Sequence, residues 1–219
     1  MLRDKAFVRV WALTALIVTV SFGQFQSSFP GYATRPGGVS THGLGLAFAA
    51  DMVTVVVAQL AVLRWLAGRR RTTGVALAAV AWAASWTVVI VGGRLGGGAA
   101  AETPFVIAMV IFAIGETLFS PTLPAIVNDL APPEAAGRYN GLGALAFTTG
   151  FLVGPAAGGA VLGRWGTGLF TALILACLVA AAAALRLSRH LPPGVNQITP
   201  PVSASEEPGA GQLSVTLDS

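Results

Sequence analysis

LGALAFTTGFLVGPAAGGAVL, residues 142–162, is a continuous apolar stretch without a charged side chain. Because an α-helix rises about 1.5 Å per residue, about 20 such residues cross a hydrocarbon core about 30 Å thick. A spanning segment must bond its own backbone groups, and this stretch lacks the alternating pattern of a transmembrane β-strand. It therefore predicts a transmembrane α-helix.

Five further apolar runs of similar length share these properties. The predicted spans lie near Phe7–Phe29, Gly43–Trp65, Thr72–Gly93, Pro104–Val127, Leu142–Leu162 and Thr167–Leu187. The connections between them are too short for a soluble domain. We expect an all-α, polytopic membrane protein whose six transmembrane helices occupy residues 1–187. The Pro, Ser, Gly and Glu mixture of Ser188–Ser219 predicts a disordered cytoplasmic tail.

The composition supports the lipid bilayer as a partner and argues against nucleic acid. Hydrophobic residues make up 54% of the chain and charged residues 10%, whereas soluble domains carry about a quarter charged residues. The net charge of +4 arises from short basic groups between apolar runs, which is typical of membrane proteins. Neither His42 and His190 nor the single Cys177 has neighbouring ligands, so no metal site and no cofactor are expected.

The basic residues also predict the orientation. Ten of them fall on one side of the predicted membrane: Arg3, Lys5, Arg9, Arg64, Arg69, Arg70, Arg71, Arg138, Arg186 and Arg189. The other side has Arg35, Arg94 and Arg164. Since Lys and Arg accumulate on the cytoplasmic side, we expect a multi-pass plasma-membrane protein with both termini in the cytoplasm.

Two acidic residues lie inside the predicted spans. Asp51 lies roughly 12 Å from the outer end of its span, and Glu116 lies roughly 18 Å deep, near the midplane. An ionisable group in hydrocarbon costs free energy and persists where it is compensated or used, so both are candidates for proton coupling. The alternative is a permanently protonated group that hydrogen-bonds a neighbouring helix. Arg94 is a possible partner for Asp51.

Uncharged polar side chains recur in the spans as well. Gln24 and Gln59 are candidates for lining a substrate pathway, which needs a few hydrogen-bonding groups on an apolar wall. Polar side chains also hold helices together in membranes, and for any one of these residues this packing role is the alternative to lining a pathway. Trp82 and Trp86, four residues apart, predict a packing face.

The fifth span contains the least accidental pattern of the chain. It consists of Gly141, Gly150, Gly154, Pro155, Gly158 and Gly159. Glycines four residues apart allow a neighbouring helix to approach closely, and a proline removes a backbone hydrogen bond and bends the helix.

This glycine-proline string resembles the antiporter motif of the major facilitator superfamily, in particular of its drug:proton antiporters. Residues 115–122 (GETLFSPT) and the loop 128–141, with Asp129 and Arg138, look like the tenth helix of that fold and the loop that follows it. Asp51 and Gln59 resemble the eighth helix, and the basic turn Arg69-Arg70-Arg71 resembles the loop after it.

The chain departs from this pattern at two positions: Asp51 replaces the usual Asn, and Ala136 replaces an expected Arg. Asp129 and Arg138 remain as possible partners in the loop. The resemblance implies the C-terminal six-helix half of a major facilitator fold, built from two inverted three-helix repeats.

The same resemblance implies a transporter, not an enzyme. The expected function is proton-coupled efflux of a small apolar or cationic compound, with Glu116 and Asp51 carrying the proton. Since six helices form one wall of the cavity, a second six-helix half or a second copy is an expected partner. The alternative is a non-transporting membrane remnant or interaction partner from a truncated gene.

Overall fold

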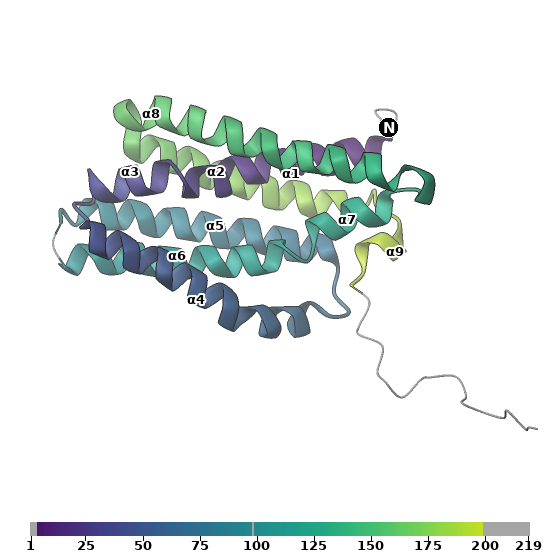
Figure 1. The fold of residues 1–219 in the computed structure, drawn as a ribbon, viewed down its shortest axis with the longest axis horizontal. Helices are drawn as coiled ribbons and strands as arrows, with labels where there is room; N and C mark the ends of the chain where they lie inside the picture. Colours follow the sequence, from purple (N-terminus) through teal and green to yellow (C-terminus); the bar gives the residue numbers. More distant parts are fainter. Residues whose placement is uncertain (1–3, 98, 199–219) are drawn as a thin grey trace, which may run out of the picture.

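The protein is described by a computed structural model that covers residues 4–97 and 99–198 (Figure 1). Within these residues the regular structure is helical. The elements are α1 (Lys5–Val20), α2 (Phe22–Phe25), α3 (Ser28–Thr34), α4 (Thr41–Leu66), α5 (Arg71–Arg94), α6 (Ala99–Phe119), α7 (Leu123–Leu130), η1 (Pro133–Ala135), α8 (Ala136–Leu187) and α9 (Pro193–Asn196).

Five helical segments of the described chain are long and apolar enough to cross a membrane, and the last of them runs from Pro133 to Leu187. The 52 residues of α8 would extend about 78 Å as one straight helix, far beyond the bilayer. Trp165 breaks the helix with φ −141° and ψ 53°, and Figure 1 shows that α8 folds back on itself. The all-α prediction is therefore confirmed, and the described chain has five long apolar helical segments, the last of which folds back into two arms.

Local capping explains where two of the passes begin. The Asp4 carboxylate accepts hydrogen bonds from the backbone N–H groups of Ala6 and Phe7 at the start of α1. The Ser40 hydroxyl accepts one from the Gly43 N–H at the start of α4, and it donates to Glu102 in α6 at 2.6 Å. The caps thus satisfy helix-end donors and also join separate passes.

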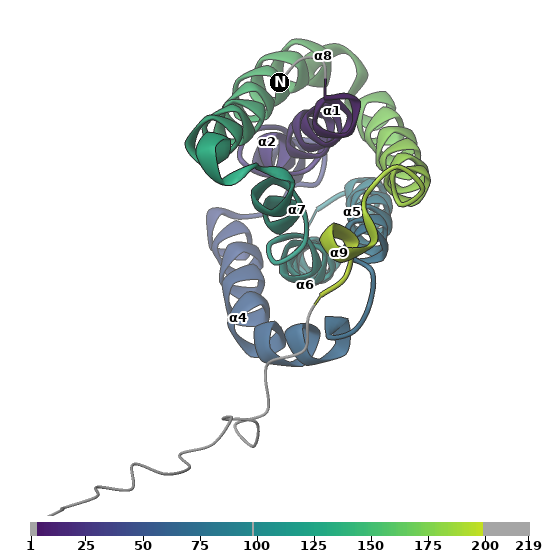
Figure 2. The same ribbon diagram turned by 90° about the vertical axis from the view of Figure 1, so that its right-hand side faces the viewer.

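The helices pack in two interlocked groups. The two arms of α8 lie on either side of α1, and α6 packs against both α4 and α5 (Figure 2). A further contact between α5 and α8 joins the groups. Trp82 and Trp86 of α5 are both fully buried there, and their indole N–H groups donate to the carbonyls of Phe112 and Val20. The predicted tryptophan packing face is confirmed.

The chain beyond Leu187 corrects one prediction. The expected disordered tail began at Ser188, but residues 188–198 are ordered and include α9. Their backbone is bonded to the α4–α5 connection, because the Gly68 N–H donates to Ile198 O at 3.0 Å and the Ile198 N–H donates to Arg69 O at 3.1 Å. The remainder of the predicted tail lies outside the described residues.

A stripe of glycines on the first arm of α8 packs closely against α1 and α2. Side chains are absent at Gly150, Gly154 and Gly158, and α1 and α2 lie directly against that stripe. Gly23 of α2 faces it, since a Cβ on Gly23 would lie 2.9 Å from the Gly154 Cα. Backbones can approach this closely because neither helix carries a side chain at the crossing.

Other members of the predicted motif do not take part. A Cβ on Gly141 or Gly159 would meet no atom within 4 Å, so neither glycine takes part in the contact with α1 and α2 within the described chain. Pro155 contacts Gly23 from the edge of the stripe, while the non-helical residue of α8 is Trp165. Only glycines spaced by four residues from Gly154 share its face of the helix.

We expect Gly154→Ala to destabilise the protein. Its Cβ would lie 2.8 Å from the Gly23 Cα and 2.9 Å from Thr19 O, and overpacking of this kind costs about 1–3 kcal/mol. Gly159→Ala is the matched control, because it adds the same methyl group on an open face and gains helix propensity. Thermal melting in detergent should show a lower Tm for Gly154→Ala alone, and equal Tm values for both variants would contradict the packing role.

Candidate functional site

Asp51 and Glu116 lie on α4 and α6, two helices that pack against each other. Asp51 is fully buried, and neither of its carboxyl oxygens has a hydrogen-bond partner among the described residues. Glu116 is half-buried on α6, the helix that packs against α4. The structure thus places the two acids on adjacent helices, and it leaves one of them with unsatisfied polar atoms.

The position of Asp51 follows from a narrow buried stripe on α4. Gly43, Ala47 and Asp51, each four residues apart, are buried, while many apolar α4 side chains, among them Val53 and Val56, are exposed. This spacing keeps the three residues on one helix face, and α6 packs against α4. Arg94 is exposed at the end of α5 and does not pair with Asp51, so the proposed Asp51–Arg94 partnership is wrong.

The helix that carries Glu116 is interrupted one turn later. α6 ends at Phe119 and α7 begins at Leu123, with Ser120, Pro121 and Thr122 between them. The Ser120 N–H and hydroxyl both donate to Glu116 O at 2.9 Å. The Thr122 hydroxyl donates to the carbonyls that precede it, so the interruption is bonded locally.

The first pass is interrupted as well, which the sequence analysis missed. Ser21 separates α1 from α2 with φ −111° and ψ −85°, and Ser27 precedes α3. The Ser21 hydroxyl donates to Ile17 O at 2.6 Å, and the Ser27 hydroxyl donates to Gly23 O at 2.8 Å. The available signal was the set of serines around Gly23, since Gly and Ser pairs are common kink sites.

Gln24 lies in the helix contact and not on an open wall. Its amide group donates to Gly154 O at 2.8 Å and to Thr19 O at 3.0 Å, and its amide oxygen accepts from the Ser28 hydroxyl at 2.6 Å. The side chain is buried and fully engaged. Gln24 therefore joins the first pass to α8, the alternative role that its sequence left open.

Gln59 occupies a different environment. It lies on α4 two turns beyond Asp51 and is partly exposed. Its sequence neighbour Leu60 and Val56 one turn earlier are apolar and exposed. Its assignment to a substrate pathway stays a prediction.

A groove of about 520 Å³ opens between α1, α7 and the first arm of α8. Phe147 and Phe151 contribute aromatic surface, and Thr14, Asn140 and Thr148 contribute polar groups. Phe151 also contacts Phe22 next to the Ser21 interruption, with ring centroids 6.2 Å apart. The groove combines three passes that are distant in sequence, so sequence patterns alone could not have defined it.

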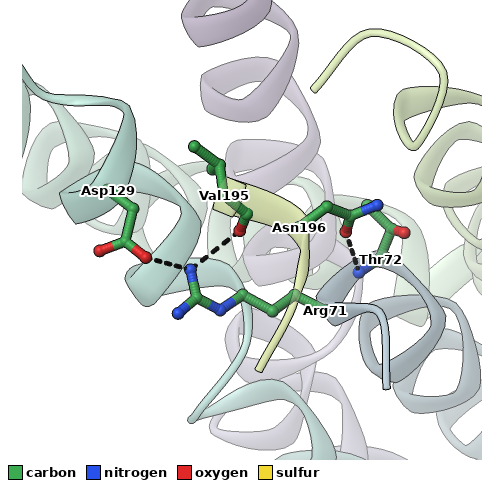
Figure 3. A network of polar contacts seen from close by, with 5 residues as sticks. All are labelled: Arg71, Thr72, Asp129, Val195 and Asn196. Atoms are coloured by element: carbon green, nitrogen blue, oxygen red, sulfur yellow. Dashed lines mark hydrogen bonds and ion pairs between the residues drawn. The ribbon is translucent and has the colours of Figure 1, made fainter. Parts of the chain in front are cut away.

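A polar network ties the loops together at the end where α1 begins and α8 ends (Figure 3). Arg71 forms an ion pair with Asp129 of α7 and donates a hydrogen bond to Val195 O at 2.9 Å. The Asn196 side-chain oxygen accepts from the Thr72 N–H at 3.1 Å. Arg71, at the start of α5, therefore joins α7 to the C-terminal segment.

The other predicted loop charges do not join this network. Arg69 stacks over the Trp65 ring and donates to Trp65 O at 2.8 Å. Arg70 and Arg138 are exposed. In the described part of the chain, the salt bridge of Asp129 is with Arg71, so Arg138 does not fill that role.

These features define a polytopic helical membrane protein with paired acids inside its helix bundle. The family model of the Major Facilitator Superfamily matches residues 8–213, and the chain belongs to this superfamily. Its members are transporters and not enzymes, in agreement with the prediction. The chain is 43% identical over 75 residues to YttB, an uncharacterized MFS-type transporter of Bacillus subtilis. This match covers 34% of the chain and 18% of YttB.

We expect Asn196→Ala to loosen the C-terminal segment. The substitution removes the acceptor of the Thr72 N–H, and loss of one buried hydrogen bond costs about 1 kcal/mol. Hydrogen exchange of the Gly68, Thr72 and Ile198 amides should become about fivefold faster. Gln197→Ala, at an exposed neighbouring position, should leave the exchange unchanged. Unchanged exchange in Asn196→Ala would contradict the role of Asn196 in holding the segment.

Proposed function

We propose that the chain is the C-terminal half of a proton-coupled transporter that exports small apolar or cationic compounds. The acid pair Asp51 and Glu116 is the observation that carries this proposal. A fully buried carboxyl group without a protein partner is costly in a membrane, and such groups mark ion and proton pathways.

The arrangement of the passes supports a transporter half built from two inverted repeats. α1 to α5 form the first repeat, and α6 to α8 form the second. The first pass of each repeat packs against the remaining helices of the other, because α1 contacts both arms of α8 and α6 contacts α4 and α5. Both of these first passes are interrupted, at Ser21 and at Ser120–Thr122. Interrupted helices at equivalent positions mark binding sites in transporter folds.

Glu116 and Asp51 would share the proton-coupling role. Two neighbouring carboxylates are hard to ionise together, so a proton bound by the pair is exchanged when water or a cation reaches it. Glu116 is the more accessible of the two, and it lies beside the interruption of its own pass. It would take up and release the proton, while the buried Asp51 would adjust the charge of the pair.

The groove beside α7 would form part of the substrate wall. Its aromatic rings suit an apolar or cationic compound, because a cation is attracted to the face of an aromatic ring. Asn140 and Thr148 would supply hydrogen bonds in this groove. Gln59 on α4 would add a further polar group to the substrate pathway. The groove is open, as expected if a second six-helix half or a second copy completes the cavity.

The distribution of charge supports a plasma-membrane orientation with both termini in the cytoplasm. The structure gathers the described members of the ten-residue basic set at one end, with the starts of α1 and α5 and the end of α8 (Figure 1). Arg35, Arg94 and Arg164 lie at the opposite end. By the positive-inside rule the first end would face the cytoplasm.

Transport can be tested with the purified chain in proteoliposomes under an imposed pH gradient, with ethidium as the cationic probe. We expect Glu116→Gln to reduce gradient-driven ethidium flux at least tenfold and Asp51→Asn to reduce it severalfold, because each removes an ionisable group. Glu134→Gln, which neutralises an exposed loop acid, is the matched control and should retain full flux.

Two results would overturn parts of this proposal. Full flux in Glu116→Gln would remove Glu116 from proton coupling. Wild-type flux equal to that of protein-free vesicles would rule out transport by the chain alone, in favour of a chain that needs a second half or that does not transport.

A further inference from the structure

A second open groove, separate from the acid pair, lies between α1 and the second arm of α8. It has a volume of about 590 Å³. Two of its residues are arginines, Arg9 from the start of α1 and Arg186 from the end of α8, and His190 lies just beyond Arg186. All three are exposed, and they lie at the same end of the bundle because α1 and this arm run in opposite directions (Figure 1).

The rest of the groove is apolar and extends towards the middle of the bundle. Leu16 lies seven residues after Arg9, and Val179 lies seven residues before Arg186, so both are about 10 Å further along their helices. Val179 is 61% exposed, which shows that this wall is not covered by protein in the described chain. The groove therefore has a basic end and an apolar body along the direction in which lipid chains run.

The basic residues have no acidic partner in the described chain. The salt bridge found there joins Arg71 and Asp129, at a different position. Asp4, the acid nearest to Arg9 in sequence, caps α1 and accepts a hydrogen bond from the Tyr139 hydroxyl at 3.0 Å. The His190 Nδ1–H donates to Arg186 O at 3.1 Å, and in the protonated ring the Nε2–H is free to donate to an anion. Positive charge is thus concentrated at the groove without compensation.

We propose that this groove binds an anionic phospholipid, with its phosphate at Arg9, Arg186 and His190 and an acyl chain along Leu16 and Val179. Arginine guanidinium groups bind phosphate oxygens through charged hydrogen bonds. Basic pockets between transmembrane helices bind anionic headgroups in this way. The proposal uses only the membrane embedding of the chain, so it stands apart from proton coupling and transport.

The test is native mass spectrometry of the purified chain, titrated with phosphatidylglycerol or with zwitterionic phosphatidylcholine. We expect tighter binding of phosphatidylglycerol, and about 30-fold weaker binding in the double variant Arg9→Gln/Arg186→Gln, since each basic residue contributes about a fivefold factor near an anionic lipid. Arg189→Gln, an exposed arginine outside the groove, is the matched control and should bind as the wild type does.

A second variant tests the apolar body of the groove while keeping both arginines. Ala182→Phe places a ring in the groove from an exposed position, so it should weaken phosphatidylglycerol binding at least threefold without lowering Tm. Inorganic phosphate at millimolar concentration should compete poorly, because it lacks the acyl chain.

Three results would overturn the proposal. Equal binding of the two lipids would exclude an anionic lipid site, and an equal loss in Arg189→Gln would show general charge attraction. Complete displacement by inorganic phosphate, together with unchanged binding in Ala182→Phe, would identify a site for free phosphate instead.

Discussion

Every backbone N–H and C=O group of this protein that lies in hydrocarbon must be bonded within the protein, because the bilayer core offers no water. This constraint makes each pass helical and limits where a pass can be interrupted. At Ser21, Ser27 and Ser120 the side-chain hydroxyl donates to a carbonyl one turn earlier, so the interrupted backbone keeps a partner. The helix interruptions are therefore tolerated where these serine hydroxyl groups lie inside the bundle.

Close packing around these interruptions depends on small residues. Gly23 and Gly154 let α2 and α8 approach until their backbones touch, and Gln24 then reaches Gly154 O across the contact. The hydrogen bond is possible only because no side chain separates the helices. The glycine stripe thus determines both the distance between the two passes and the role of Gln24.

Charge is distributed by two different rules. Inside the bundle, Asp51 and Glu116 lie on helices that pack against each other. Burying an ionisable side chain in a membrane costs free energy, which argues for a functional role of these two acids. At the basic end of the bundle, Arg71 is paired with Asp129 and fixes the C-terminal segment, whereas Arg9 and Arg186 remain at an open groove. The first pair belongs to the proposed proton path, and the last two residues belong to the proposed lipid site.

The sequence by itself determined the six passes, the direction of the charge bias and the two candidate acids, because hydropathy and charge act locally along the chain. Tertiary structure decided which glycines touch a neighbour, that Gln24 holds helices together, that the helices of Asp51 and Glu116 pack against each other, and that Arg71 pairs with Asp129. Each of these outcomes depends on the rotation of one helix against another. That rotation is set by packing between passes distant in sequence, so no single segment encodes it.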